Sequence, residues 1–455
     1  MNQTMTEKPV DAAPLASHGA SPLTGRFLTP GDKAITHRAL MVSALAVGRS
    51  TLEGVLDARD VQSTAAALRH LGVRIDNADD VWHVYGLGVG GLMAPQVRLD
   101  LGDSATGLRL LLGLLAPYNF SSRFTGGPLL TRRPLKALLD ALAPIGVAIE
   151  EAVEGGLPLT RCGAVLPLPF LHVMHAPSDQ IKAALLLAAA QIAGTSTIIE
   201  PFATNDHMEN LLADFGAAIT VTPDEAGGSS ITVSGLAELR PRHLVMPGDP
   251  TCAGYAVVAA LIVPGSDIVV ENVLVNPLRT GLIDTLLEMG GDIQFINQRE
   301  VGGEHVADLR VRSSRLKGIT IGAVHAGTML DDIPALAVAA SYAQGETMIE
   351  GLADLRLQKC DRLAATAAGL AANKVTVTEG EASLRIVGDG KVDGGGRVAT
   401  RSDHRIAMSF LVLGLASRHR VTVDDTNSIA MSFPGLLAAM TALGGRFETA
   451  KAKKS

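Results

Sequence analysis

Leu71-Gly72-Val73-Arg74-Ile75 is the stretch that decides the fold, because close copies of it recur along the chain. Each copy follows a helical stretch and precedes residues of alternating polarity. Glycine is favoured at the left-handed position just beyond a helix, so each copy predicts a helix that ends at the glycine and a strand after it. The glycines of the five copies are spaced 74, 70, 74 and 154 residues apart: Gly72, Gly146, Gly216, Gly290 and Gly444.

The last interval is about twice the others, and a copy without glycine fills it, with a helix predicted over 362–370 and a strand over 375–377. The chain therefore contains six units of about 70–80 residues, each mixing helices with short strands. Because 455 residues are too many for one hydrophobic core, six units favour two domains of three units each.

The first and last copies lie at opposite ends of the chain, so one domain is expected to be discontinuous. We predict one domain over 23–30 and 246–455 and the other over 31–245, with approximate boundaries. Residues 1–22 are polar and contain no apolar segment, so we expect a disordered leader and not a signal peptide. The longest apolar runs, 183–190 and 255–263, are too short to cross a bilayer and predict buried helices.

The composition excludes some partners. Only 3% of the residues are aromatic and the formal net charge is −7, which argues against a nucleic-acid-binding protein. The three cysteines are far apart, so we expect neither a disulfide framework nor a zinc site, and the usage fits a reducing cytoplasm. We expect no metal, no membrane partner and a monomer.

The nine residues from Pro30 to Arg38 are the strongest candidate for an anion-binding site. A Pro-Gly-Asp turn follows the apolar strand that ends at Leu28 and precedes a helical run predicted over 39–47. Backbone N–H groups at a helix start suit an anion, and Lys33 and Arg38 add two cations. Taken alone, these residues also fit a surface turn with two solvated basic side chains.

Other segments place basic or small polar residues beside predicted helix starts. Arg362 and Arg405 each lie in a first helical turn, where the helix dipole disfavours a cation. A bound phosphate or carboxylate would compensate for that cost, and so would a local pair with Asp361 or Asp403. Three further turns have the same character: 102–107, 131–134 and 178–182.

Together these segments resemble the EPSP synthase family, the 3-phosphoshikimate 1-carboxyvinyltransferases, in its glyphosate-insensitive, class II-like bacterial branch. The resemblance covers roughly residues 23–447; 30–38 is similar to the family motif PGDKSxSHR, and the Asp-His-Arg-Ile-Ala-Met run is intact at 403–408. It implies the α/β (α+β) enolpyruvyl transferase fold, with two domains of three βαβαββ repeats in an inside-out α/β barrel. It further implies transfer of the enolpyruvyl group of phosphoenolpyruvate to an alcohol, without a cofactor, in the cytoplasm.

By position, the resemblance implies a complete set of side chains for phosphoenolpyruvate, here called the donor clamp: Lys33, Arg133, Gln180, Arg362 and Arg405. Gly102 and Ala105 belong to the turn beside it, and Ala105 matches the position where alanine crowds out glyphosate. Asp331 matches the aspartate that faces the acceptor hydroxyl and could take its proton. Lys33 could protonate the enol or the leaving phosphate.

The departures from the family pattern concentrate on the acceptor. Ala34, Asn205 and Gln358 replace a serine, an arginine and a lysine that contact the 3-phosphate of shikimate in the family. A lost charge-assisted bond costs about 1.5–3 kcal/mol. The acceptor site is therefore predicted to suit an alcohol with less negative charge.

Three further positions bear on the acceptor and the chemistry. Arg38 and Ser178 are retained, while Asp179 adds a carboxylate to the same subsite. Lys359 stands where the family has a glutamate that helps to move protons at the methylene carbon, so the mechanism is either re-routed or slow. Three hypotheses stay open: a transferase with an altered acceptor, an EPSP synthase that compensates for the changes, and a non-catalytic phosphoenolpyruvate-binding protein.

Overall fold

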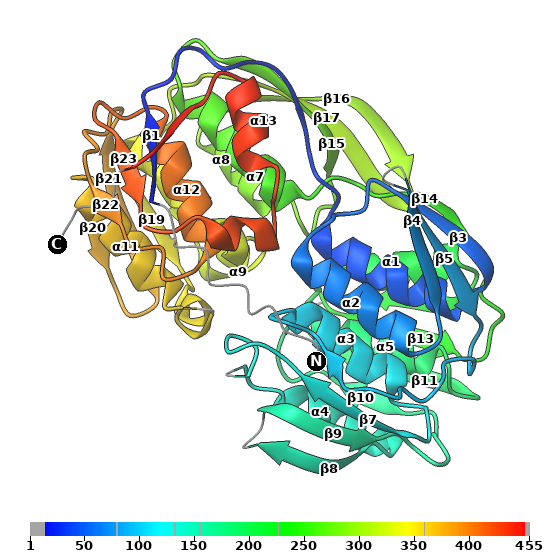
Figure 1. Cartoon of the computed structure of the whole chain (residues 1–455). Helices are drawn as coiled ribbons and strands as arrows, with labels where there is room; N and C mark the ends of the chain where they lie inside the picture. The colour runs from blue at the N-terminus through cyan, green and yellow to red at the C-terminus, as the bar shows by residue number, and fades with distance from the viewer. Residues whose placement is uncertain are drawn as a thin grey trace, which may run out of the picture.

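The repeat is present as six four-stranded sheets in the part of the chain that the structure describes. This computed structural model describes residues 14–450 apart from seven positions: Asp79, Asp80, Arg132, Glu154, Gly155, Ala226 and Lys359. Figure 1 shows two lobes, each with helices inside and sheets toward the outside. The mixed α/β fold of two three-unit domains is the predicted one.

One unit of the second lobe gives the common plan. Its elements are β6 (Leu99–Asp100), α3 (Ala105–Leu115), β7 (Ser121–Thr125), α4 (Lys136–Leu142), β8 (Ala148–Val153) and β9 (Gly156–Cys162). The strand order in the sheet is β6-β7-β9-β8, with β6 and β7 parallel and the other pairs antiparallel. This is a βαβαββ unit.

Two more units repeat this plan without interruption. One consists of β10 (Leu171–Val173), α5 (Asp179–Ala189), β11 (Thr195–Glu200), α6 (His207–Asp214), β12 (Ala218–Pro223) and β13 (Ser229–Ser234). The other consists of β18 (Thr320–Ile321), α9 (Ala323–Gly327), α10 (Ile333–Ser341), β19 (Gln344–Glu350), α11 (Arg362–Ala372), β20 (Thr376–Glu379) and β21 (Ser383–Asp389).

Two units exchange their first strands. β2 (Thr24–Leu28) pairs in parallel with β15 of one lobe, although the chain runs on from β2 into the other lobe. That unit is α7 (Pro250–Ile262), β15 (Asp267–Leu274), α8 (Gly281–Glu288), β16 (Asp292–Val301) and β17 (Glu304–Arg312). Reciprocally, β14 (His243–Val245) pairs in parallel with β3. β14 is thus the first strand of the unit that consists of α1 (Lys33–Leu45), β3 (Val47–Glu53), α2 (Arg59–His70), β4 (Arg74–Ala78) and β5 (Val81–Leu87).

The sixth unit corrects the prediction of a disordered leader. It contains β22 (Arg397–Val398), α12 (His404–Gly414), β23 (Val421–Val423), α13 (Leu436–Ala442) and β24 (Arg446–Thr449). Its remaining strand is β1 (Leu15–His18), which pairs with both β23 and β24. In the sheet order β22-β23-β1-β24, β1 takes the place of the last strand of the unit, and its residues Ala16 and Ser17 are buried. The leader prediction is wrong for 15–18, and residues 1–13 lie outside the described residues.

The left-handed turn that ends the second helix of each unit is present in all six copies. The five repeat glycines have φ between 91° and 111°. Lys374 takes this position in the copy without glycine, with φ of 65°. A side chain at such a position costs about 1–2 kcal/mol, so the sixth copy keeps the turn at the expense of local strain.

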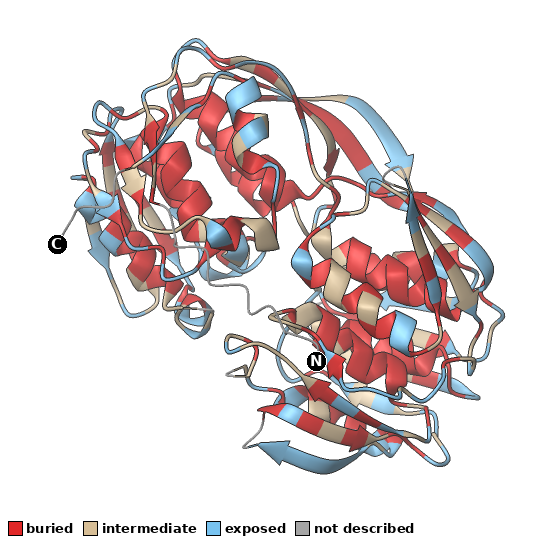
Figure 2. Ribbon diagram, viewed as in Figure 1, coloured by how far each residue is buried: buried red, intermediate tan, exposed pale blue. Residues whose placement is uncertain are grey.

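Each lobe has its own hydrophobic core. We call the lobe that contains α1–α6 domain II and the lobe that contains α7–α13 domain I. The core of domain II contains residues from Ile35 to Met246 together with Leu274, and the core of domain I contains Leu23, Phe27 and residues from Cys252 to Leu443. Figure 2 shows the inner helices buried and outer strands such as β8 and β16 largely exposed. Every residue of α7 and α10 is buried. None of the helices in the described residues is both long and apolar enough to span a membrane.

Candidate functional site

The chain crosses between the domains twice, and the two crossings lie side by side. The Asp32 N–H donates to the Pro247 carbonyl at 2.7 Å, and the Asp249 N–H donates to the Pro30 carbonyl at 2.8 Å. Each crossing ends in a helix cap: Asp32 accepts from the Ile35 N–H at 2.8 Å. Helix α1 therefore begins at Lys33, and the prediction of a helix over 39–47 was wrong at both ends because the Asp32 cap was not recognised.

Arg279 binds both capping aspartates. Its guanidinium lies 3.1 Å from Asp32 Oδ2 and 3.6 Å from Asp249 Oδ1. Burial would raise the pKa of Asp32, but Arg279 and His207 hold that pKa below its usual value. Burial and the charge of Asp32 raise the pKa of Asp249. Arg279 thus compensates two carboxylates that would otherwise repel each other.

Lys33 lies at the junction of the domains, in the first turn of α1. Its ammonium forms an ion pair with Asp60 of α2 and lies 3.5 Å from the carbonyl oxygen of Met431, which belongs to domain I. Beside Asp60 is a cleft of about 630 Å³, lined by the start of α2, the Gly102–Asp103 turn and residues 430–434. The surface-turn alternative for Lys33 is wrong, because the side chain is largely buried and paired.

Arg362 and Arg405 converge on Asp331 in domain I. Arg362 Nη1 lies 2.9 Å from Asp331 Oδ1, and Arg405 Nη2 lies 2.8 Å from Asp331 Oδ2. Arg362 also donates through Nε to Asp403 at 3.1 Å. Burial would raise the pKa of Asp331, but the two arginines hold it well below its usual range. Asp331 is therefore ionised, and its side chain is 54% exposed, which also favours the charged form.

The local Asp–Arg pairs considered from the sequence are not formed. Asp361 caps α11 by accepting from the Ala364 N–H at 2.9 Å, and its ion pair is with Arg356 at 2.8 Å. Asp403 caps α12 and pairs with Arg362 of the preceding unit, while Arg405 pairs with Asp331. Only the folded chain brings these groups together, since their separations in sequence are long.

Backbone strain precedes the Asp403 cap. Arg401 and Ser402 adopt φ of 52° and 59°, in the left-handed region that ordinary side chains avoid. Strained conformations of this kind persist where the surroundings hold them and concentrate at functional sites. They mark the turn that leads to Arg405.

Arg133 of domain II lies near Arg362 of domain I. It is half-buried, and the described residues include no carboxylate paired with it. Burial and the nearby charge of Arg362 lower the pKa of Arg133. The carboxylates of Asp331, Asp403 and Asp60 act on that pKa in the other direction, so Arg133 lies among charges of both signs.

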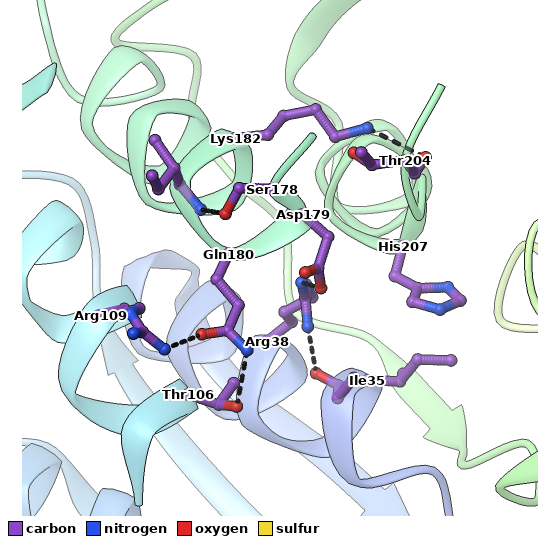
Figure 3. A network of polar contacts seen from close by, with 12 residues as sticks. Ile35, Arg38, Thr106, Arg109, Ser178, Asp179, Gln180, Lys182, Thr204 and His207 are labelled. Carbon is purple, nitrogen blue, oxygen red and sulfur yellow. Dashed lines mark hydrogen bonds and ion pairs between the residues drawn. The ribbon is translucent and has the colours of Figure 1, made fainter. Parts of the chain in front are cut away.

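Gln180 is held by a hydrogen-bond network that Figure 3 shows from close by. Its Oε1 accepts from Arg109 Nη1 at 2.7 Å, and its Nε2 donates to Thr106 Oγ1 at 3.5 Å. The small-residue turn that holds Ala105 leads directly to Thr106, because α3 begins at Ala105 after the Ser104 cap. Arg109 was not assigned to the site from sequence; its position in an otherwise apolar helix was the available signal.

Arg38, one of the predicted acceptor residues, is buried and paired with Asp179. Its side chain is 1% exposed, and its Nη2 donates to Asp179 Oδ2 at 2.9 Å (Figure 3). Its Nη1 donates to the carbonyl oxygen of Ala34 at 3.0 Å. The one retained cation of the predicted subsite is thus neutralised by the protein itself.

Three further predicted acceptor residues lie in different segments of the fold. Ser178 caps α5 by accepting from the Ile181 N–H at 3.3 Å. Asn205 is half-buried in the loop between β11 and α6, and Gln358 is half-buried after a 3₁₀ turn. Lys359 lies outside the described residues, so its predicted role stays a prediction.

One cluster has the composition of a metal site: Asp206, His207 and Glu304. His207 Nδ1 lies 2.7 Å from Glu304 Oε1, and its Nε2 lies 3.2 Å from Arg279 Nη1. Both ring nitrogens are engaged, and a guanidinium borders the cluster. We therefore interpret these residues as a contact between the domains.

A family model described as EPSP synthase (3-phosphoshikimate 1-carboxyvinyltransferase) matches residues 17–440. The chain belongs to the EPSP synthase family. The 3-phosphoshikimate 1-carboxyvinyltransferase of Paramagnetospirillum magneticum is 49% identical over 437 residues, covering 96% of this chain and 98% of that protein. The protein of the same name from Chelativorans sp. is 47% identical over 438 residues, with the same coverage.

Solved structures agree with this assignment. An EPSP synthase from Acinetobacter baumannii matches with a TM-score of 0.87 and 32% identity, over 96% of this chain and all of that one. The enolpyruvyl transferase NikO from Streptomyces tendae matches with a TM-score of 0.76 over 97% of this chain, and at 20% identity it shows the fold alone. The enolpyruvyl transferase fold predicted for this member of the EPSP synthase family is confirmed.

Several residues of the candidate site were missed from sequence. Asp60 pairs with Lys33, while Asp249 and Arg279 hold the crossings. A signal existed for Asp249, because Pro-Gly-Asp occurs at both 30–32 and 247–249. Nothing in the sequence singled out Asp60 or Arg279.

Proposed function

We propose that this protein transfers the enolpyruvyl group of phosphoenolpyruvate to a hydroxyl of shikimate 3-phosphate or of a related, less phosphorylated alcohol, with release of phosphate. It acts as a cytoplasmic monomer of the class II-like branch. Ala105, the first residue of α3, supplies the methyl group that disfavours glyphosate.

The donor clamp supports this proposal. Arg362 and Arg405 converge in domain I, and Arg133 of domain II lies near Arg362. Phosphoenolpyruvate carries a phosphate and a carboxylate, which need several cations placed around them, and arginine binds both groups through paired N–H donors. Lys33 and Gln180 complete the set from domain II.

Asp331 becomes able to act as a base when its two arginine partners bind phosphoenolpyruvate instead. While two arginines hold it, its low pKa makes it a weak base. When phosphoenolpyruvate engages Arg362 and Arg405, the carboxylate of Asp331 loses part of that stabilisation and its pKa rises. It then accepts the proton of the attacking acceptor hydroxyl. Lys33, at the opposite side of the junction, donates a proton to the enol carbon or the leaving phosphate.

The ion pair between Arg38 and Asp179 is the observation that carries the acceptor proposal. A phosphate bound there would approach the Asp179 carboxylate and would compete with it for Arg38. Ala34, Asn205 and Gln358 provide no cation in exchange. A neutral acceptor group that donates a hydrogen bond to Asp179 fits this subsite better than a phosphate does.

An acceptor screen tests the proposal. The purified protein is mixed with phosphoenolpyruvate and with shikimate 3-phosphate, shikimate or unrelated alcohols, and phosphate release is followed. We expect turnover with a less phosphorylated alcohol at lower concentration than with shikimate 3-phosphate. Robust turnover of shikimate 3-phosphate at micromolar concentration would contradict the altered acceptor.

The same assay distinguishes a transferase from a non-catalytic phosphoenolpyruvate-binding protein. Binding of phosphoenolpyruvate without turnover of any alcohol would favour a non-catalytic binding protein. In addition, the pair of substitutions Lys359→Glu and Gln358→Lys is expected to raise turnover of shikimate 3-phosphate, because it restores the two side-chain types found in the family. An unchanged rate would show that these positions do not limit the reaction.

A further inference from the structure

Lys182 is a charged side chain buried beneath the acceptor subsite. It belongs to α5, is 1% exposed, and its ammonium lies 3.0 Å from Glu200 Oε1 and 2.7 Å from Glu209 Oε1. Glu200 ends β11 and Glu209 lies in α6, so the three charges join three successive elements of one unit. None of them is part of the donor clamp.

The same ammonium holds the loop that carries Asn205. Lys182 Nζ donates to the carbonyl oxygen of Thr204 at 3.2 Å, and Thr204 Oγ1 donates to Glu200 Oε2 at 2.8 Å. Thr204 is the residue before Asn205. Both its carbonyl and its hydroxyl are therefore bound to the buried charges.

The other end of this link is the start of α5. Lys182 follows Ser178 by one helical turn, and its N–H donates to the Ser178 carbonyl at 3.0 Å. Figure 3 shows Lys182 and Thr204 on one side of Ser178, and Gln180 and Arg38 on the other. One side chain thus connects the helix that presents Asp179 to the loop that presents Asn205.

The charge balance argues against a role in stability alone. One cation faces two carboxylates, burial raises the pKa of Glu209, and Glu209 Oε2 has no hydrogen-bond partner among the described residues. Apolar side chains of similar volume often stabilise an interior as well as a buried ion pair does. A buried charge network that brings no gain in stability is better explained by the loop that it holds in place.

We propose that Lys182 is a positioning residue for the acceptor: through Thr204 it sets where Asn205 lies relative to Asp179, and so it sets acceptor affinity and selectivity. This inference rests on the proposed function, which makes Asn205 and Asp179 acceptor residues. It assigns Lys182, Glu200 and Thr204 no contact with either substrate.

Thr204→Val is the sharpest test, because it keeps the shape of the side chain and removes only the hydroxyl donor. Ser229→Ala is its matched control, since Ser229 Oγ donates to the other oxygen of the same carboxylate, Glu200 Oε1, at 3.1 Å from strand β13. We expect Thr204→Val to raise KM for the accepted alcohol about 3- to 10-fold, the loss of one ordinary hydrogen bond. We expect kcat and KM for phosphoenolpyruvate to change less than twofold, and Ser229→Ala to change neither KM.

A second readout does not depend on activity. Amide hydrogen exchange of residues 201–206 is expected to accelerate in Thr204→Val and in Lys182→Met, and to keep the wild-type rate in Ser229→Ala. Lys182→Arg, which keeps the charge, is expected to restore part of the protection. Thr204→Val decides the matter if Lys182→Met fails to fold.

The outcomes separate this inference from the proposed function. If the wild-type protein turns over an alcohol and Thr204→Val matches Ser229→Ala in both KM and exchange, the positioning role is wrong while the function stands. If the wild-type protein turns over no alcohol, the proposed function fails, and exchange alone decides whether Lys182 holds the loop. Equal losses in kcat and in both KM values would indicate a general structural role and overturn the inference.

Discussion

Asp32 and Asp249 occupy equivalent places on the two crossings between the domains, each capping the helix that follows it. Asp32 caps α1 in domain II and Asp249 caps α7 in domain I. Asp249 Oδ2 also lies 3.5 Å from the backbone nitrogen of Lys33. The position of Lys33 is thus tied to both crossings and to the guanidinium of Arg279 that they share.

Arg279→Met is expected to destabilise the protein by about 3–5 kcal/mol, because it leaves two buried carboxylates without their cation. Adding Asp249→Asn should recover part of the loss, since it removes the repulsion while an asparagine can still cap the helix. Thermal unfolding of the wild type, both single variants and the double variant measures the coupling free energy between Arg279 and Asp249. Additive losses would show that Arg279 does not act through Asp249.

Asp179→Ser is expected to shift acceptor preference toward phosphorylated alcohols. The substitution frees the buried Arg38 and removes a negative charge from the subsite. A gained charge-assisted bond corresponds to about a 10- to 100-fold improvement in the ratio of KM for shikimate to KM for shikimate 3-phosphate. Asp179→Asn, which removes the charge and keeps a hydrogen bond to Arg38, should lie between. A ratio unchanged in both variants would remove Asp179 from the acceptor site.

Asp331→Asn separates binding from chemistry. We expect kcat to fall by about 10²-fold or more, because the amide cannot take the acceptor proton. Binding of phosphoenolpyruvate should hold or tighten, since Arg362 and Arg405 lose a competing carboxylate. Steady-state rates and calorimetric titration measure the two effects. Asp361→Asn is the matched control, because it keeps the cap of α11 and should leave kcat within twofold; retention of kcat in Asp331→Asn would rule out the base role.

Asp332, the residue after Asp331, is expected to change the stability of the protein with pH in the opposite direction to Asp331. Burial raises its pKa from 3.8 to about 6, although Arg405 and a hydrogen bond from Thr251 act in the other direction. The folded state therefore binds a proton more tightly than the unfolded state does, and stability falls as pH rises from about 4 to about 6. Above that range, the ionised carboxyl of Asp332 lowers the free energy of unfolding by about 3 kcal/mol.

Asp332→Asn is uncharged at every pH, so it is expected to raise Tm relative to wild type at pH 7.5 and to lose that advantage near pH 4. Asp331→Asn should behave oppositely, because arginines depress the pKa of Asp331, and its contribution is present above the unfolded pKa and lost as pH falls. Thermal unfolding of the three proteins across this range measures both signs. A pH-independent difference between Asp332→Asn and wild type would show that the carboxyl does not titrate there.

Much of the fold was predictable because it is encoded locally. The helix-stop glycines report a left-handed turn that few other residues adopt cheaply, and φ at Gly72 and its four equivalents confirms them. The same logic located the copy in which Lys374 takes that position. What local patterns could not give was the place of β1, which pairs with β23 and β24 from the other end of the chain, because no spacing predicts that pairing.

For the site, the sequence supplied the side chains and the tertiary structure supplied their partners. Lys33, Arg362 and Arg405 were identified from motifs at helix starts. Their carboxylates, Asp60 and Asp331, come from other helices, and sequence reasoning had offered neighbouring aspartates instead. Ion pairs depend on distance in space, and local sequence does not report it.

The sequence by itself determined a six-unit α/β chain, and it predicted an anion-binding set and a changed acceptor side, because backbone turns and residue chemistry are local properties. Only the tertiary structure decided that Asp179 neutralises Arg38, that Arg279 holds both crossings, and that Lys182 links Thr204 to α5. Each of these depends on elements that meet only after the domains form, since burial and packing bring distant charges within bonding distance.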